Sequence, residues 1–416
     1  MINKRKIIND PVYGFIHIKS DLLFDLVQHP YFQRLRRIRQ LGLTYLVYPG
    51  ANHTRFQHAI GAMHLMQLAL DTIKSKGHEI TDEEAEAAQV AILLHDIGHG
   101  PFSHALEQVL IENKTHEDIS LHYMQRLNEE FDGKLELAIK IFENQYHKHF
   151  LHQLVSSQLD MDRLDYLRRD SFFTGVTEGV IGSDRIIKML NVVNDNLVIE
   201  VKGIYSIEKF LIARRLMYWQ VYLHKTVISA ENLVVNLLRK ARELFSEGEN
   251  LPATPALQYF MVKDKHGYEL NSVKAGEINQ WLEHYSMLDD DDIISSAKMW
   301  MQQDHPALSF LAYNLLNRKL YKIELQKEPF SPDKVSKYKN ILLKKYPELK
   351  NDLNYFVFAN STYSSTYDYR AEKILVLLKN NTLVDVSEAS DMLDLQKISK
   401  IIKKHFLCYP EICRYS

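Results

Sequence analysis

The sequence predicts a mainly α-helical protein with a small β-hairpin insertion and a mixed α/β C-terminal region. Glycine and proline are scarce, with 15 and 11 among 416 residues, which favours helices over a β-sandwich. Apolar residues recur at helical spacing over long stretches of the N-terminal half. Strand-like patterns are short and stand out around residues 191–203 and 355–370.

Capping residues predict the first helices. Pro30 at a first-turn position opens a helix over residues 31–41, which Gly42 ends. A second helix runs over 58–77 and ends at Gly77. A capping box of Thr81 and Glu84 opens a third, which ends at His95 and Asp96, and N-cap candidates at Ser103 and Thr115 open two more.

The remainder of the chain predicts a long helix and a separate C-terminal region. The segment 191–203 predicts a hairpin that turns at 194–196, as an insertion and not as a domain. Residues 206–247 lack proline and glycine and predict one very long helix or two nearly collinear ones. We expect a first domain over 1–250 and a helical or mixed region over 251–416, packed on that domain and involved in oligomerisation.

Composition narrows the function class. A net charge of −2 excludes a global positive field that would recruit nucleic acid, although a local basic pocket could bind phosphates. The two cysteines, Cys408 and Cys413, form neither a disulfide framework nor a zinc-finger pattern. The basic N-terminus lacks the apolar segment of a signal peptide, and no run of 18 apolar residues occurs. The sequence therefore predicts a cytoplasmic protein without a membrane partner.

The segment LLHDIGHGPFSH, residues 93–104, predicts metal-ligand chemistry. Nine of the 19 histidines lie between His53 and His122. An unpartnered buried imidazole or carboxylate costs several kcal/mol, and a shared cation would satisfy His95 and Asp96 together. His58 and Asp162 are further candidate ligands, and this mixed nitrogen and oxygen set suits Mn, Fe, Co, Ni or Zn, with Mg also open.

Several motifs in order resemble those of the HD-domain deoxynucleoside triphosphate triphosphohydrolases. These motifs are INDPVYGFI, FQRLRRIRQLG, YPGANHTRFQHAIG, HDIGHGPFSH, THED and MDRLDYLRRD, and the resemblance covers roughly residues 6 to 230. It implies an HD-domain helical bundle within the first domain and metal-dependent hydrolysis of dNTPs to deoxynucleoside and inorganic triphosphate. The implied metal ligands are His58, His95, Asp96 and Asp162.

Histidines near the ligands are candidates for proton transfer. Within the helix that Ser103 is expected to open, His104 and Glu107 share a face, so the carboxylate could orient the imidazole and raise its pKa. His116 has an acidic neighbour in Glu117, and the sequence leaves open which histidine protonates the leaving oxygen. The alternative is that these are helix-capping and surface groups. The candidate catalytic set is His99, His104, Glu107 and His116.

Two arginines are candidate phosphate contacts by their position: Arg55 precedes His58 by three residues and is expected to face the same cleft, and Arg214 lies on the long helix two turns before Tyr222. The other contacts follow from the resemblance, which implies Gln40 and Asp170 at a sugar hydroxyl, Arg163 at phosphate, and Tyr166 and Tyr222 against the deoxyribose. Lys6, Gln33 and Arg36 match a regulatory nucleotide site between subunits of tetrameric family members. Gln28 stands where that pattern has an acid, which argues against guanine specificity.

Two other functions remain open. One is an HD phosphohydrolase acting on nucleoside monophosphates, cyclic dinucleotides or guanosine polyphosphates. The other is a nucleotide-sensing or nucleic-acid-binding protein with weak hydrolysis, for which single-stranded nucleic acid is a candidate partner. We expect a homo-oligomer, either a dimer or a tetramer.

Overall fold

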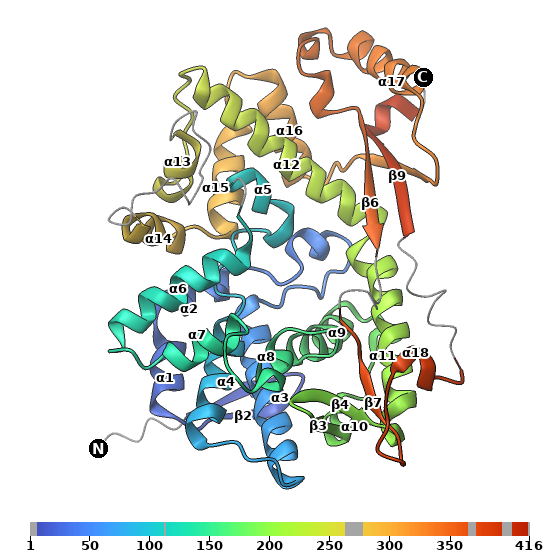
Figure 1. The fold of residues 1–416 in the computed structure, drawn as a ribbon. Coiled ribbons are helices and arrows are strands. Elements are labelled where there is room, and N and C mark those ends of the chain that lie inside the picture. Colours follow the sequence, from blue (N-terminus) through green and yellow to red (C-terminus); the bar gives the residue numbers. More distant parts are fainter. Residues whose placement is uncertain (1–5, 112–113, 263–277, 365–371, 393–401, 415–416) are drawn as a thin grey trace.

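The computed structural model describes residues 6–111, 114–262, 278–364, 372–392 and 402–414, and is mainly helical as the sequence predicts (Figure 1). The N-terminal half comprises the hairpin β1 (Lys6–Asp10) and β2 (Gly14–Ile18), then α1 (Asp21–Gln28), α2 (Pro30–Gln33), α3 (Arg55–Ser75), α4 (Asp82–Leu94), α5 (Glu107–Leu110), α6 (His116–Glu130), α7 (Glu136–Phe142), α8 (His149–Val155) and α9 (Met161–Thr174).

The central and C-terminal elements continue with α10 (Ser183–Met189), β3 (Leu190–Val193), β4 (Asn196–Glu200), α11 (Ile204–Met217), α12 (Lys225–Ser246), α13 (Pro255–Val262), α14 (Ile278–Ser286), α15 (Asp290–Trp300), α16 (Pro306–Leu316), β5 (Lys322–Gln326), α17 (Pro332–Lys345), β6 (Phe358–Ser364), β7 (Leu375–Leu377), β8 (Leu383–Asp385), α18 (Val386–Ala389) and β9 (Ile402–Tyr409). No helix in the described ranges is both long and apolar enough to cross a membrane.

Helix α3 is the centre of the N-terminal half and packs against α4 and α9. Thr54 and Gln57 form a capping box at its start, and Gly77, at φ +90°, follows its C-terminus. The Thr81–Glu84 capping box of α4 is confirmed, as is the N-cap of α6 at Thr115, which reciprocates with Asp118. These caps fix the helix ends that carry the polar residues described below.

The prediction of a helix over 31–41 is wrong beyond its first turns. The helix α2 continues only as a 3-10 turn to Arg37, and Ile38 is extended. The backbone then pairs with the segment before α3, since Gln40 N–H donates to the His53 carbonyl at 3.0 Å and Arg55 N–H to the Ile38 carbonyl at 3.0 Å. Pairing with a neighbouring segment replaces the helical hydrogen bonds and places Gln40 beside Arg55.

The prediction of a continuous helix that begins at Ser103 is also wrong. Phe102 and Ser103 both have φ of +51°, residues 103–105 form a 3-10 turn, and α5 begins only at Glu107. Two successive left-handed residues cannot belong to a right-handed helix. The α-helix therefore begins only at Glu107, and the expected contact between His104 and Glu107 stays a prediction, since the side chain of His104 lies outside the described residues.

Of the two alternatives for the segment 206–247, the structure has two helices, but they meet at a bend and are not collinear (Figure 1). A π-helical turn over Tyr218–Tyr222 follows α11, and His224 is extended at φ −62° and ψ 130° before α12 begins. Figure 1 shows the chain bending there, with α11 in the lower half of the view and α12 in the upper half. The bend aims Tyr218 and Tyr222 at the site described below.

The predicted hairpin is confirmed as β3 and β4, but it belongs to a larger sheet. The strand order is β3-β4-β7-β8, and β4 pairs with β7 in parallel. Part of the strand-like segment 355–370 is β6, which pairs with β9 in the sheet β5-β9-β6. Residues 365–371 lie outside the described residues.

The C-terminal region packs directly on the N-terminal helices. The buried guanidinium of Arg34 donates to the carbonyls of Leu288 (3.1 Å) and Ile97 (2.8 Å). The carboxylate of Asp290 accepts from the backbone N–H groups of Arg39 (3.0 Å) and Phe102 (2.8 Å). The division at residue 250 stays a prediction, and one hydrophobic core includes residues on both sides of it.

Candidate metal centre and active-site cavity

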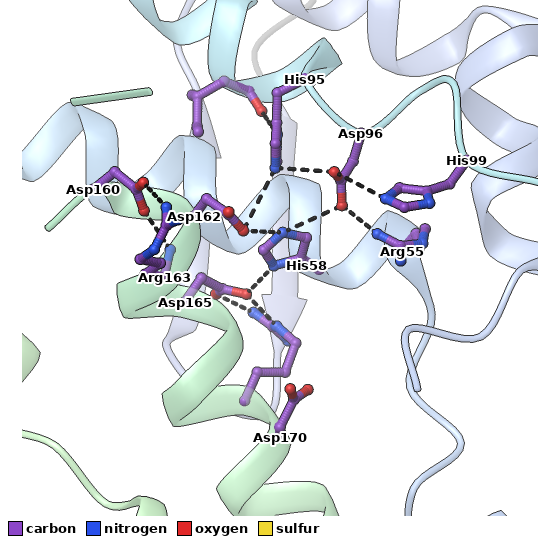
Figure 2. Close-up of polar contacts among 12 residues, drawn as sticks. Arg55, His58, His95, Asp96, His99, Asp160, Asp162, Arg163, Asp165 and Asp170 are labelled. Atoms are coloured by element: carbon purple, nitrogen blue, oxygen red, sulfur yellow. Dashed lines mark hydrogen bonds and ion pairs between the residues drawn. The ribbon is translucent and has the colours of Figure 1, made fainter. Parts of the chain in front are cut away.

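Three helix ends bring the four predicted metal ligands together (Figure 2). His58 lies one turn into α3, His95 and Asp96 follow the last residue of α4, and Asp162 is in the first turn of α9. Asp160 caps α9 by accepting from the Arg163 N–H at 2.7 Å. The ligands therefore sit on rigid, capped elements.

The four side chains face one another across short distances. His58 Nε2 lies 3.1 Å from Asp162 Oδ1 and 3.6 Å from Asp96 Oδ2. His95 Nε2 lies 3.3 Å from Asp96 Oδ1 and 3.6 Å from Asp162 Oδ1. Ligand atoms of His58, His95 and Asp162 lie within 4.8 Å of one another, the spacing of a metal-binding group.

The unused ring nitrogens fit a metal ion. His58 Nδ1 donates to Asp165 Oδ2 at 2.7 Å, and His95 Nδ1 donates to the Ile92 carbonyl at 2.6 Å. Each Nε2 is buried and has no hydrogen-bond partner within the described part of the chain. Metal-bound histidines commonly donate their other ring nitrogen to a carboxylate or carbonyl in this way. The donor set therefore fits a divalent cation between the two Nε2 atoms and the two carboxylates.

The electrostatics also favour positive charge at this point. Burial lowers the pKa of His58, but the neighbouring carboxylates of Asp162 and Asp165 outweigh it and raise that pKa to about 10. Burial raises the pKa of Asp96, yet His95 and Arg55 hold it well below its usual value. Two ionised carboxylates in a buried site attract either a proton or a metal ion.

A cavity of about 380 Å³ opens beside Asp96 and Asp162, a volume in the range of small-molecule sites. Every substrate-contact residue expected from the sequence lines it: Gln40, Arg55, Arg163, Tyr166, Asp170, Arg214 and Tyr222. The structure thus brings together residues that come from the segment before α3 and from α3, α9, α11 and the π turn.

Guanidinium groups give the cavity its positive charge. Arg55 forms an ion pair with Asp96 and donates from Nε to Ser103 Oγ at 2.9 Å. Arg163 pairs with Asp160, and Arg214 Nη1 donates to Gln158 at 3.2 Å. The Nε atoms of Arg163 and Arg214 are buried without a partner among the residues described. Unsatisfied guanidinium donors suit a bound phosphate.

One wall of the cavity consists of a carboxylate and aromatic rings. Asp170 Oδ2 accepts from the Tyr222 hydroxyl at 2.8 Å, and Asp170 Oδ1 lies 2.7 Å from His53 Nε2. The rings of Tyr166 and Tyr222 meet edge to face with centroids 6.2 Å apart. The Oε1 atom of Gln40 is buried and lacks a partner in the described ranges. These groups suit a hydroxylated ring such as a sugar.

Two of the predicted catalytic residues, His99 and His116, line the cavity on the side of Asp96. His99 Nε2 lies 3.4 Å from Asp96 Oδ1, and the rings of His99 and His116 stack with centroids 3.8 Å apart. Glu107 Oε1 accepts from His116 Nδ1 at 3.1 Å and from its backbone N–H at 2.5 Å. Burial, together with Arg55 and His116, holds the pKa of His99 well below its usual value. The side chain of His104 lies outside the described residues.

Several residues of this site were missed by the sequence analysis. Asp165 stands three residues after Asp162 within MDRLDYLRRD, a spacing that places both on one face of α9. The sequence analysis also missed His53 and Tyr218. The position of Tyr218, one helical turn before Tyr222, could have indicated it. Glu231 lines the cavity, and burial raises its pKa to about 7. No motif in the sequence marks Glu231.

The residues matched to a regulatory nucleotide site do not line this cavity. Lys6 Nζ lies 4.8 Å from the centroid of the Phe24 ring, and Gln33 Nε2 donates to the Val27 carbonyl at 2.6 Å. Arg36 Nε donates to Gln33 Oε1 at 2.8 Å, and Gln28 is exposed at the end of α1. A regulatory nucleotide at Lys6, Gln33 and Arg36, and the oligomer it implies, stay predictions.

Comparison with known proteins identifies two family regions. Residues 55–170 match the HD domain, and residues 181–254 match the HD associated region. An uncharacterised protein of Bacillus subtilis is 32% identical over 99% of this chain and 93% of its own length. The deoxynucleoside triphosphate triphosphohydrolase SAMHD1 homolog of Dictyostelium discoideum is 30% identical over 59% of this chain and 51% of its own.

A solved structure extends the likeness to nearly the whole fold. The crystal structure of a phosphohydrolase from Bacteroides thetaiotaomicron matches with a TM-score of 0.93 and 51% identity, over 98% of this chain and 100% of that one. The HD domain begins at Arg55 and ends at Asp170, so it contains the four proposed ligands. The chain belongs to the HD-domain phosphohydrolase family, and the HD associated region follows its HD domain.

Proposed function

We propose that the protein hydrolyses dNTPs to deoxynucleoside and inorganic triphosphate. The observation that carries this proposal is the position of the His58, His95, Asp96 and Asp162 cluster beside a cavity with guanidinium groups and a Tyr222–Asp170 wall. The SAMHD1 homologues named for this activity support the substrate class. The metal is a divalent ion that the donor set leaves as Mn, Fe, Co, Ni, Zn or Mg.

The arrangement divides the work between two parts of the cavity. A divalent cation, when bound, acts as a Lewis acid on a phosphoryl oxygen and lowers the pKa of a nearby water. Arg55, Arg163 and Arg214 bind the negatively charged triphosphate and stabilise the additional charge that develops on the phosphoryl group during the reaction. Water attacks the α-phosphorus, the bond from phosphorus to O5′ breaks, and a proton must reach the departing O5′.

Either His104 or His116 supplies that proton, and Glu107 orients His116. The Glu107 carboxylate accepts from the backbone N–H and from ring Nδ1 of His116, so it fixes the orientation of the ring. His99 remains neutral because burial and its cationic neighbours lower its pKa. Its position beside Asp96 suits a hydrogen bond to the substrate phosphate.

Glu107→Gln is expected to lower kcat by about 10-fold, which is less than the ~10²-fold typical of losing a general acid. The amide keeps the size of the side chain but replaces one acceptor oxygen with an NH₂ group, so the orientation of the His116 ring is less well fixed. Metal content should not change, because Glu107 touches none of the proposed ligands. Comparison of His116→Ala with His104→Ala then assigns the acid, and a Glu107→Gln effect confined to KM would reassign His116 to phosphate binding.

The substrate class is tested by incubating the metal-analysed protein with each of the four dNTPs. We expect inorganic triphosphate and deoxynucleoside in equal amounts, with little turnover of ribonucleotides. Release of pyrophosphate or of monophosphate would favour an HD phosphohydrolase with another nucleotide substrate. Tight binding of single-stranded nucleic acid without hydrolysis, retained in His95→Ala, would favour a sensor.

A further inference from the structure

A chain of buried charged groups leads from the proposed ligand His58 to the N-terminal hairpin. Asp165 Oδ2 accepts from His58 Nδ1 at 2.7 Å. Arg169 binds both oxygens of Asp165, from Nε at 2.9 Å and from Nη2 at 3.0 Å. Its remaining terminal nitrogen, Nη1, donates to Asp10 Oδ2 at 2.8 Å. His58, Asp165 and Arg169 are fully buried, and Asp10 is 4% exposed.

Asp10 has two separate functions in this arrangement, one for each carboxylate oxygen. Oδ1 accepts from the backbone N–H groups of Val12 and Tyr13 at 2.9 and 3.0 Å, which fixes the turn between β1 and β2. Oδ2 is left for Arg169. The Tyr13 ring then covers the guanidinium, whose central carbon lies 5.6 Å from the ring centroid. The hairpin turn therefore closes over Arg169 from two directions.

Helix α3 leaves no spare room around this pair. Gly61, one turn after His58, faces the Asp165–Arg169 ion pair, and a Cβ there would lie 2.1 Å from Asp165 Oδ1 and 2.2 Å from Arg169 Nη2. Such distances are impossible for non-bonded atoms, so the glycine is required for the pair to cross α3 at this point. Figure 2 shows Asp165 directed at His58 from α9.

We propose that Asp10 is a positioning residue for the metal centre and acts on the ligand His58 through Arg169 and Asp165. This inference rests on the proposed metal centre and not on the identity of the nucleotide. Asp165 and Arg169 alone form a neutral pair, and Asp10 makes the buried chain net negative next to the cation. Asp10 also accepts from the guanidinium nitrogen that Asp165 does not contact. Arg169 is thereby fixed from two sides, and it fixes the orientation of Asp165, which in turn fixes the orientation of the His58 ring.

The variant that separates the two functions of Asp10 is Asp10→Asn. The asparagine oxygen still accepts from Val12 and Tyr13, while its NH₂ group cannot accept from Arg169. Losing a partner beyond the ligand shell typically weakens metal binding by about 10- to 100-fold, and we expect about 10-fold for Asp10→Asn. The measurement is the dissociation constant of Mn²⁺ by isothermal titration calorimetry on chelator-stripped protein, with no substrate present.

Asp352→Asn is the matched control. Asp352 forms an ion pair of 2.8 Å with the mostly buried Lys240 and does not line the cavity. Both substitutions remove one carboxylate charge from a partly or fully buried pair, so both should lower the melting temperature of the metal-free protein. Only Asp10→Asn should change the Mn²⁺ dissociation constant, and an equal constant in wild type and Asp10→Asn would overturn the inference.

A double-mutant cycle tests whether Asp10 affects metal binding through Asp165. If Asp10 acts through Asp165, then adding Asp10→Asn to Asp165→Asn should change the dissociation constant by less than about twofold, because coupled residues are not additive. Fully additive effects would contradict an action of Asp10 through Asp165.

If Asp10→Asn does not fold, Arg169→Lys is the substitute variant. It keeps the net charge but lacks the forked guanidinium that bridges both carboxylates. Unchanged Mn²⁺ affinity in Arg169→Lys would also overturn the inference. Wild-type protein that binds no divalent ion would instead contradict the metal centre itself.

Discussion

Replacing Asp96 with alanine is expected to abolish metal retention and hydrolysis together. Asp96 lies 3.3 Å from His95 Nε2 and 3.6 Å from His58 Nε2, and it also pairs with Arg55. Removing one partner from a buried charged cluster costs about 3–5 kcal/mol, and a loss of that size in metal binding corresponds to an affinity lower by on the order of 10²–10⁴-fold. Turnover should fall at least as far, because Arg55 also loses the group that orients it.

Metal content by plasma mass spectrometry and dNTP turnover are the two measurements for Asp96→Ala. Asp170→Asn is the matched control, because Asp170 is a buried carboxylate of the same cavity that contacts Tyr222 and His53 and not the proposed ligands. It should retain a normal metal content and lose activity through substrate binding. Full metal occupancy with normal turnover in Asp96→Ala would refute the ligand assignment.

The ligand cluster could be predicted because its signal is local in the sequence. His95 and Asp96 are adjacent at the end of an apolar helix, and His58 and Asp162 each lie near the start of a helix, within segments that resemble HD-domain motifs. The capping boxes at Thr81 and Thr115 depend on residues three apart, so the sequence alone predicts those helix ends.

Features that depend on distant contacts could not be predicted in this way. The helix beginning at Pro30 stops early because its backbone pairs with residues 53–55, and the hairpin β3–β4 joins β7 from the other end of the chain. The contact of Asp10 with Arg169 spans 159 residues. The contact of Glu107 with His116 spans nine residues and two separate helices, so helical spacing, which suggested only His104 as a partner of Glu107, could not predict it.

Selection of deoxyribose is expected to depend on the aromatic pair Tyr166 and Tyr222. An apolar pocket rejects an added hydroxyl by only about 10², so stronger discrimination requires a rigid wall where the 2′-hydroxyl would lie. The two rings brace each other edge to face, and the Tyr222 hydroxyl is fixed by Asp170. Tyr166 also stands one helical turn after Asp162 on the same face of α9, and both line the cavity.

Tyr166→Ala and Tyr222→Ala should each lower the ratio of kcat/KM for dGTP over GTP, by up to about 10²-fold. Truncation opens space for the 2′-hydroxyl, and looser positioning lowers the rate on both substrates. Tyr222→Phe is the matched control: it keeps the ring but loses the hydrogen bond to Asp170, so both rates should fall while the ratio stays close to that of wild type. If the alanine variants lose activity equally on dGTP and GTP, the two tyrosines are packing residues and do not select the sugar. Sugar selection would then have to come from hydrogen bonds of Gln40 or Asp170, which line the same cavity.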